Sequence, residues 1–444
     1  MKSNCIVNAN YILIDEVNAS DTYTITDYAD SINQYDDEIS ESNKVIDEQL
    51  KYWKQLPQYP QKSKEWLNQR SMYIGGSESG AALGVNHYEP VYKFIWKKLE
   101  TIPFTDFTAV YHGNKYEDVV IMIYEWIYNI KVDEYGFLTH KTNKILGASP
   151  DGITSNYKLD GVHNSNLERV MLEIKCPTSR KINMDVNASL MDIIPEYYYY
   201  QVQQQMEVCE LEHCDFFQLK VSEYGNYNEF KTDTSKECVF KSKDGKFKGA
   251  VIQLLPINVF RGITLTNPNK RLKQKIYAHA KFIHQPKLNM SAEEIKQWII
   301  DVRNGNSPDI SNDEVLKHYQ IKDGYFFHCV KYWKAEYGRC KRISRDHLWM
   351  SKHGEEYEYV WSIVEFFRDN EELKDIYCAV CKNLEFSTGF YKTADINKRN
   401  QQTMDNIIKK LMSNNRSEIE EIKNMIDSNP DINKAPKAYT YNLI

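Results

Sequence analysis

The chain has 444 residues, a length that favours two domains, and 42% of them are hydrophobic, which is enough for a sizeable core. A mean hydropathy of −0.62 and the lack of any apolar run near the roughly 18 residues of a membrane span argue against a membrane protein. The N-terminus lacks the basic and apolar regions of a signal peptide, and nine cysteines form no dense framework. We therefore expect an intracellular, cytoplasmic protein with reduced thiols that is neither secreted nor bound to a membrane.

The charge is unevenly distributed along the chain. Residues 1–60 carry 11 acidic and 4 basic side chains, a net charge of −7, whereas the whole chain has a net charge of −6. We expect residues 1–60 to be a separate, acidic and partly disordered segment. Because the remainder is almost neutral, it would bind a polyanion through a local basic site and metal ions.

The hydrophobic pattern after this segment first predicts helices. These are a short helix over 61–70, a Gly-rich turn at 75–77, a small-residue helix over 79–83, a helix beginning near Pro90 and an amphipathic helix over 114–130.

The period then changes to that of strands. The sequence predicts a strand pair (136–140 and 144–148), a turn at 149–152, a strand over 170–176, a helix over 197–208 and a strand over 215–221. This order is typical of a small α/β sheet domain, which we place at 61–260. Residues 261–444 are predicted to be a mainly helical region of unknown role, with a helical pair over 396–427 that packs on its own domain or forms an arm.

The strand over 170–176 carries the residues with the clearest chemistry. Alternation places Glu173 and Lys175 on one face, with Leu172 and Ile174 on the other. A carboxylate and an ammonium group in an apolar strand are costly to bury unless they serve a purpose. Binding of a divalent metal by Glu173, with Lys175 positioning or activating a water molecule, would supply such a purpose. Oxygen ligands favour Mg²⁺ or Mn²⁺.

The tripeptide Glu-Ile-Lys has little specificity alone, because it occurs three times, at 173–175, 294–296 and 421–423. The second and third copies are predicted on solvated helix faces, so only the first lies in a strand. Upstream of it, Pro150-Asp151-Gly152 ends another strand, and neighbouring strands can bring Asp151 and Glu173 to one edge of the sheet. A similar Pro308-Asp309 pair lies in a polar loop with no strand after it.

Together, Asp151 and Glu173-Ile174-Lys175 are similar to the signature of the PD-(D/E)xK nucleases. Five blocks, in order over about 66–220, resemble the lambda-exonuclease branch, also called the YqaJ-like viral recombinase family: RSMYIGGSESGAALG, GNKYED, LGASPDGI, LEIKCP and YYYYQVQQQM. The resemblance implies a restriction-endonuclease-like α/β (α+β) fold, with a central mixed sheet flanked by helices and a mostly helical C-terminal extension.

The resemblance also implies roles for single residues. Asp151, Glu173 and Lys175 match the catalytic residues, and Glu117, Asp151, Glu173 and the carbonyl group of Ile174 match the ligands of two Mg²⁺ ions. Substrate-binding positions are Arg70 and Ser77 for a 5′-phosphate, Ser149 near the metals, and Gln201; Tyr198 shares a helix face with Gln201. Without the resemblance, Glu117 would be interpreted as a solvated carboxylate, Arg70 as a surface ion pair and Ser149 as a local cap.

The activity implied is metal-dependent 5′→3′ digestion of one strand at double-stranded DNA ends, which leaves 3′ single strands for recombination or repair. A homo-oligomer, such as the family's trimer, and a single-strand annealing protein are implied partners. Length and AT-rich composition suit a large DNA virus, and hence the host cytoplasm or viral factory. A structure-specific endonuclease and a catalytically inactive DNA-binding scaffold remain alternatives, although every expected metal-site position holds a competent residue.

Overall fold

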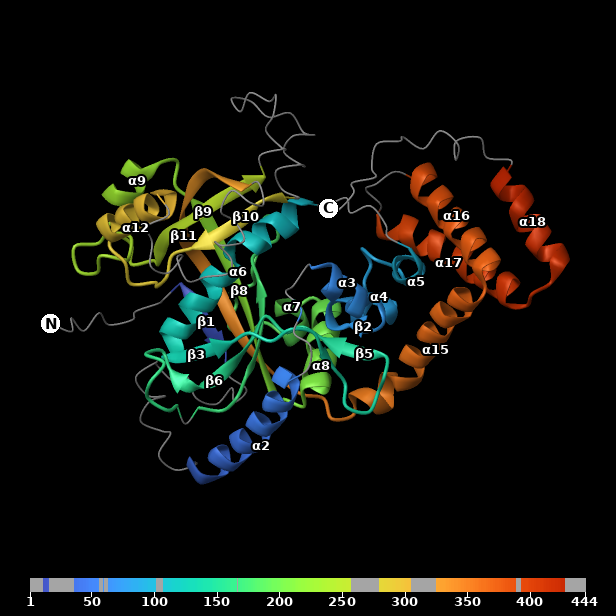
Figure 1. Cartoon of the computed structure of the whole chain (residues 1–444), viewed down its shortest axis with the longest axis horizontal. Helices are drawn as coiled ribbons and strands as arrows, with labels where there is room; N and C mark the ends of the chain where they lie inside the picture. The colour runs from blue at the N-terminus through green and yellow to red at the C-terminus, as the bar shows by residue number, and fades with distance from the viewer. Residues whose placement is uncertain are drawn as a thin grey trace.

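A long, curved mixed sheet forms the body of the protein, and a helical lobe extends from one side of it (Figure 1). The computed structural model describes residues 11–15, 36–55, 59, 63–100, 107–165, 167–256, 279–304, 325–388 and 393–427. The strand order of the main sheet is β10-β9-β11-β8-β7-β6-β3, and β1 pairs with β11. Its strands are β1 (Ile12–Asp15), β3 (Ile130–Asp133), β6 (Gly152–Lys158), β7 (Met171–Lys175), β8 (His213–Glu223), β9 (Lys248–Pro256), β10 (Lys281–His284) and β11 (Tyr325–Ser344).

A second, three-stranded sheet lies beside the first, in the order β2-β5-β4. Its strands are β2 (Ile74–Gly75), β4 (Leu138–Thr139) and β5 (Leu146–Ala148), and the antiparallel β4–β5 pair is the strand pair predicted from the sequence. In the main sheet, β7–β8 and β1–β11 are parallel and the other pairs are antiparallel. The predicted α/β class with a central mixed sheet flanked by helices is therefore confirmed.

Two helices cover opposite faces of β7, and its side chains alternate between them. Leu172 and Ile174 join a hydrophobic cluster with α6 (Phe107–Tyr128), whereas Met171 packs in the cluster that contains α8 (Glu196–Cys209). Glu173 and Lys175 consequently lie on the α8 side, as the period of two predicted. The other helices before β8 are α2 (Asp36–Gln55), α3 (Lys64–Ser71), α4 (Ser79–Ala82), α5 (Val91–Leu99) and α7 (Leu190–Ile193), with a 3₁₀ turn, η2, at Gly76–Glu78.

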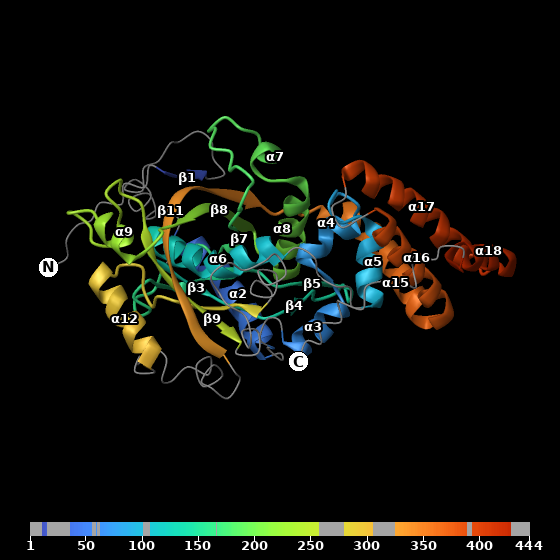
Figure 2. The same ribbon diagram turned by 90° about the horizontal axis from the view of Figure 1, so that it is seen from above.

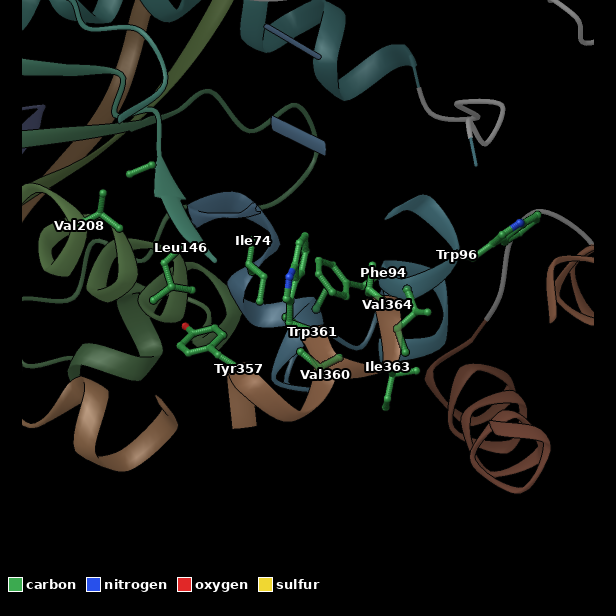
Figure 3. Packing of buried hydrophobic residues seen from close by; sticks show 14 of the residues in the cluster. Ile74, Phe94, Trp96, Leu146, Val208, Tyr357, Val360, Trp361, Ile363 and Val364 are labelled. Carbon is green, nitrogen blue, oxygen red and sulfur yellow. The ribbon is translucent and has the colours of Figure 1, made fainter. Parts of the chain in front are cut away.

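The helical lobe is built on the same core as the α8 side of the sheet. Figure 3 shows Val360, Trp361 and Val364 of α15 near Phe94 of α5, and all four side chains are buried. The lobe comprises α15 (Trp349–Asp369), α16 (Glu371–Thr388), α17 (Ala394–Met412) and α18 (Arg416–Asp427). The helices α17 and α18 form the predicted helical pair, and their apolar positions pack into this core.

The sheet extends past the boundary that the sequence suggested at residue 260. The strand β11 pairs with β8 on one side and β9 on the other, so a central strand comes from the region 261–444 (Figure 2). The helix α9 (Tyr227–Thr232) precedes β9 in the chain, and α12 (Ala292–Asn304) follows β10. Much of the described part of 261–444 is nevertheless helical, as predicted.

Part of the predicted acidic segment is folded onto the sheet domain. In α2, Ile46, Leu50 and Trp53 are buried in the core, and the Asn43 side chain exchanges two hydrogen bonds of 2.9 Å with the backbone of Leu167 and Arg169. The rest of 1–60 lies outside the described residues, except for 11–15, which include β1, and residue 59. Within the described ranges, no helix is long and apolar enough to cross a membrane, and the cysteines are free thiols.

The end of β8 is joined to α6 by a partly buried ion pair. Lys115 and the Tyr116 hydroxyl donate to Glu223 Oε1 at 2.5 and 2.7 Å, and Lys331 lies 3.1 Å from the other oxygen. Burial opposes the ionisation of Glu223, but Lys115 and Tyr116 outweigh it and lower the pKa of this carboxyl to about 2. The pair therefore stabilises the folded state only where Glu223 is ionised.

We predict that Glu223→Gln lowers the free energy of unfolding at neutral pH by about 1–2 kcal/mol, because it removes a charged acceptor that is partly screened by solvent. A carboxyl with a lowered pKa loses its contribution as the pH falls from the ordinary value of 4.5 towards 2. Urea unfolding of both proteins should therefore show a difference that shrinks between neutral pH and about pH 3. A difference independent of pH would contradict this assignment.

Candidate active site

The pairing of β6 with β7 brings two carboxyl groups together. Gly152 pairs with Leu172, so the next position of this antiparallel register places Asp151 opposite Glu173. Asp151 Oδ2 accepts a hydrogen bond of 2.6 Å from the backbone N–H of Ile174. The structure thus brings together residues 173–175, at the C-terminal end of β7, and the aspartate that directly precedes β6.

Glu173 is buried, with 1% of its surface exposed, and only one of its oxygens is satisfied. Lys175 Nζ forms a close ion pair with Oε1, and Gln201 Nε2 donates to the same oxygen at 2.7 Å. Among the described residues, Oε2 is buried and has no hydrogen-bond partner. A buried carboxylate oxygen without a partner is costly and is a position where a cation would bind favourably.

The electrostatics of this group show an excess of negative charge. Burial raises the pKa of Asp151 well above its ordinary value, and the nearby carboxyl groups of Glu173 and Glu117 raise it further, while Lys175 opposes them. Burial disfavours the ammonium form of Lys175, but Glu173 and then Tyr198 and Asp151 raise its pKa above the ordinary range. Asp151 and Glu173 therefore both interact with the ammonium group of Lys175.

A hard divalent cation fits the chemistry of these donors, since it prefers carboxylate and carbonyl oxygens. As they stand, however, no three His, Cys, Asp or Glu side chains in the described ranges are arranged to hold an ion. Lys175 and Gln201 occupy the Oε1 atom of Glu173 in this arrangement, which leaves Oε2 for a ligand.

The predicted residues of α8 also lie at this site. The ring of Tyr198 has its centroid 4.7 Å from Lys175 Nζ, a cation–π contact, and Gln201 binds Glu173 as described. Ser149 contributes its carbonyl group, which accepts a weak hydrogen bond of 3.4 Å from Gln205 Nε2.

Arg70 and Ser77 meet in a second group of residues, on α3 and η2. Arg70 Nη2 donates to Ser77 Oγ, and its guanidinium group lies over the Trp66 ring at 5.0 Å. The nearby Glu78 is bound by the buried Lys98 at 2.8 Å and is 4.0 Å from Arg70 Nε. Because Lys98 neutralises Glu78, the positive charge of Arg70 stays available to an anion beside the exposed Ser77.

A model of a known protein family matches the part of the chain that holds both groups of residues. Residues 65–212 match the model of the YqaJ-like viral recombinase domain. The family predicted from the motifs is confirmed for these residues.

Two further proteins are similar to the chain, and one of them is matched in two solved structures. Uncharacterized protein R354 of Acanthamoeba polyphaga mimivirus is 32% identical over 380 residues, which cover 84% of this chain and 65% of that protein. The chain thus spans about two thirds of the length of this curated relative. An alkaline exonuclease, LHK-Exo, from Laribacter hongkongensis has 15% identity and a TM-score of 0.34, over 70% of this chain and 98% of that one. Its complex with dAMP gives 15% identity and a TM-score of 0.33, over 70% and 100%.

Two glycines of the YqaJ-like domain lie in close contact with α8, and they flank the turn that carries Ser77, the partner of Arg70. A Cβ atom at Gly76 would lie 2.5 Å from Gln205 Cγ, and one at Gly80 would lie 2.9 Å from Tyr197 Cβ. A side chain at Gly76 would require the Gln205 side chain to move, and one at Gly80 would require the backbone of α8 to move. These glycines allow the backbone to approach closely, which couples the Arg70 group to the helix that carries Gln201.

Sequence reasoning missed several polar residues that support the YqaJ-like domain. Gln204 Nε2 donates to the carbonyl groups of Ile74 and Gly147 at 2.7 and 3.1 Å, and so ties α8 to the small sheet. Arg342 binds the buried Asp215 through two hydrogen bonds of 2.9 and 3.0 Å. The run of glutamines in QVQQQ could have indicated the first contact, but Arg342 lies beyond the boundary that the sequence suggested.

His284 of β10 is another support that lies outside the matched region. Its Nδ1 atom is 2.7 Å from Asp118 Oδ2 and its Nε2 atom is 2.9 Å from the carbonyl oxygen of Lys115. Both partners flank Glu117 on α6. The histidine therefore fixes the turn of α6 that presents Glu117 towards Asp151.

We predict that Gly76→Ala lowers the free energy of unfolding by about 1–3 kcal/mol, because its methyl group would overlap the Gln205 side chain. The matched control is Gly113→Ala in α6, where a Cβ atom meets nothing within 4 Å. This control should raise stability by about 0.5–1 kcal/mol, since alanine favours a helix. Denaturant unfolding would measure both, and equal effects in the two variants would contradict the close approach.

Proposed function

We propose that this protein is a metal-dependent DNA nuclease that digests linear duplex DNA from its 5′ ends and leaves 3′ single strands for recombination or repair. The observation that carries the proposal is the buried Glu173, paired with Lys175 opposite Asp151 and left with one unsatisfied oxygen. The match of residues 65–212 to the YqaJ-like viral recombinase domain supports it.

The ligands proposed for Mg²⁺, or Mn²⁺, are the carboxyl groups of Glu117, Asp151 and Glu173 and the carbonyl group of Ile174, which would hold two ions. Support comes from the unpartnered Glu173 oxygen and from the mutual repulsion of the three carboxyl groups, which a cation would relieve. Divalent ions at such sites lower the pKa of a bound water and neutralise charge on a phosphate.

Lys175 has the role of a hydrogen-bond donor in this proposal. Its ammonium group is held between Glu173 and the face of the Tyr198 ring, so it is already oriented before substrate arrives. From there it would orient the attacking water or stabilise negative charge that develops on the scissile phosphate. Gln201 keeps Glu173 in place and so acts through it.

Arg70 and Ser77 are proposed to bind the 5′-terminal phosphate. An arginine fork, a hydroxyl group and the backbone of a Gly-rich turn suit a phosphate dianion. Lys98, which neutralises Glu78, supports this role because an uncompensated Glu78 would repel the phosphate. A homo-oligomer and a single-strand annealing protein complete the proposal, and both rest on the family resemblance alone.

We predict that Glu173→Gln lowers the cleavage rate at least about a hundred-fold with little loss of folded protein, because it removes the charge that orients Lys175 and would bind metal. The matched control is Glu421→Gln, in the third Glu-Ile-Lys copy, whose glutamate is an exposed residue of α18. End-labelled duplexes with Mg²⁺ would be the substrate. If both variants cut at the wild-type rate, the catalytic assignment fails.

The same assay tests the mode of digestion. Ends with a 5′-phosphate should be digested faster than 5′-hydroxyl ends, and Arg70→Gln should abolish this difference. Covalently closed circles should remain intact. Cutting of circles would instead indicate an endonuclease, and binding without any cleavage would indicate a scaffold protein.

The metal site can be tested without activity. We expect Mg²⁺ to raise the unfolding temperature of the wild type, by the equivalent of about 2.7 kcal/mol at a concentration one hundred times the dissociation constant. Asp151→Asn should lose this increment yet be at least as stable in EDTA, because it removes a repelling carboxyl group and its amide oxygen can still accept from Ile174. An undiminished Mg²⁺ effect in this variant would exclude Asp151 as a ligand.

A further inference from the structure

A connected series of aromatic rings leads from the candidate active site to the surface. The Tyr198 ring, which contacts Lys175, has its centroid 4.4 Å from that of Tyr197. Tyr197 in turn lies 6.0 Å from both His87 and Tyr88, whose rings are 3.9 Å apart. We call Tyr198, Tyr197, His87 and Tyr88 the aromatic track.

The outer end of the aromatic track is exposed rather than packed in the core. Tyr88 has 66% of its surface exposed, and His87 beside it is exposed as well. The inner end, at Tyr198, packs on Phe216 of the sheet with a centroid distance of 5.8 Å. The series therefore begins at Lys175 and ends in solvent, which burial of apolar surface does not explain.

The loop that carries His87 and Tyr88 is held firmly. The backbone N–H groups of Val85 and Asn86 both donate to the carbonyl oxygen of Gly80 at 2.9 Å, and Asn86 Oδ1 accepts from Tyr88 N at 3.0 Å. From α17, the buried Asn397 donates to the carbonyl oxygen of His87 at 2.8 Å. Two exposed rings are thus pre-organised by the helical lobe, and pre-organisation lowers the entropy cost of binding.

Positive charge lies along the same path. Arg180 is close enough to Tyr197 to oppose the rise that burial causes in the pKa of this phenol. Arg180 belongs to the loop after β7, and Lys220 fixes that loop by donating to the carbonyl groups of Pro177, Thr178 and Arg180 at 2.9, 2.6 and 3.1 Å. A fixed cation beside stacked rings suits a ligand that has both phosphates and flat bases.

We propose that the aromatic track binds single-stranded DNA, with unpaired bases stacking on the rings of Tyr88 and His87 and the backbone passing Arg180 towards Lys175. The proposal rests on the proposed nuclease function, because it places the strand next to that active site. It also gives the C-terminal lobe a part in substrate binding, in which Asn397 is a positioning residue.

The test compares a single-stranded thymidine oligonucleotide with an abasic oligonucleotide of equal length. Binding to the full chain would be measured by fluorescence anisotropy in EDTA, where cleavage does not interfere. Since one stacked base contributes about 5- to 150-fold in affinity, Tyr88→Ala should weaken binding of the thymidine oligonucleotide by this factor and leave the abasic one unchanged. Tyr88→Phe should bind as the wild type does.

The matched control is Tyr52→Ala, on α2, which lies away from α17 in both Figure 1 and Figure 2. Tyr52 is 59% exposed, so it resembles Tyr88 in exposure, and its variant should bind both oligonucleotides normally. Asn397→Ala should weaken binding of the thymidine oligonucleotide more than binding of the abasic one. A general loss of protein stability would weaken both equally. Equal affinities of wild type and Tyr88→Ala, or equal losses for both oligonucleotides, would overturn the proposal.

Failure of the track and failure of the nuclease proposal are distinguishable. Cleavage of duplex ends by the wild type without base-dependent binding would leave the nuclease and exclude the track. The opposite result is a wild type that never cleaves DNA but binds the thymidine oligonucleotide more tightly than the abasic one, a preference that Tyr88→Ala removes. That result would support the aromatic track and exclude the nuclease.

Discussion

The burial of Glu173 is the constraint on which the rest of the site depends. An ionised carboxylate in a protein interior costs several kcal/mol unless it is paired, and here both Glu173 and the nearby Asp151 depend on the ammonium group of Lys175. The two hydrophobic clusters on either side of β7 offset this cost, because they fix the strand whatever the charge state of its polar face. The chain therefore holds a destabilising arrangement at the point where a strongly charged ligand would relieve it.

The helix α8 transmits this constraint to its surroundings. Three of its buried glutamines bind Glu173, the carbonyl groups of the small sheet and the carbonyl group of Ser149. Gly76 lies against Gln205 and Gly80 against Tyr197, so the turn that carries Ser77 also contacts this helix closely. A displacement of α8 would therefore move the carboxylate site and the Arg70 group together, which favours one substrate that spans both.

Local patterns were sufficient to predict the central part of the site. The alternation of Leu172, Glu173 and Ile174 follows from strand geometry alone. The predicted strand before Asp151 is β5, which lies in the small sheet; Asp151 meets Glu173 because it precedes β6, a strand that was not predicted from the sequence and that pairs with β7. The two other Glu-Ile-Lys copies lie on α12 and α18, as predicted, so context separated three identical tripeptides. The Pro308-Asp309 pair lies outside the described residues.

Long-range supports could not be predicted in the same way. The strand β11 mixes polar and apolar residues, and its place between β8 and β9 depends on partners about one hundred residues away. Arg339 of β11 is only 1% exposed, and its burial is possible because it donates to the carbonyl groups of Asn183 and Asp185. No local sequence pattern indicates this environment. Asn397 resembles an ordinary polar residue of a helix, and only the fold shows that it reaches the loop at His87.

These long-range contacts change how the C-terminal region should be understood. The strand β11 pairs with β8, the parallel neighbour of β7, and a short link connects it to α15, which begins at the buried Trp349. From α15, Tyr357 forms a buried hydrogen bond of 2.6 Å with Ser79, and Arg368 donates to the carbonyl groups of Ser71 and Lys98 at 2.8 and 3.0 Å. Residues 71–98 include the Arg70 group's Ser77 and the outer end of the aromatic track. The C-terminal region is thus a structural part of the site, because it holds in place the segments that carry Ser77 and the outer end of the aromatic track, the two surfaces proposed to contact DNA.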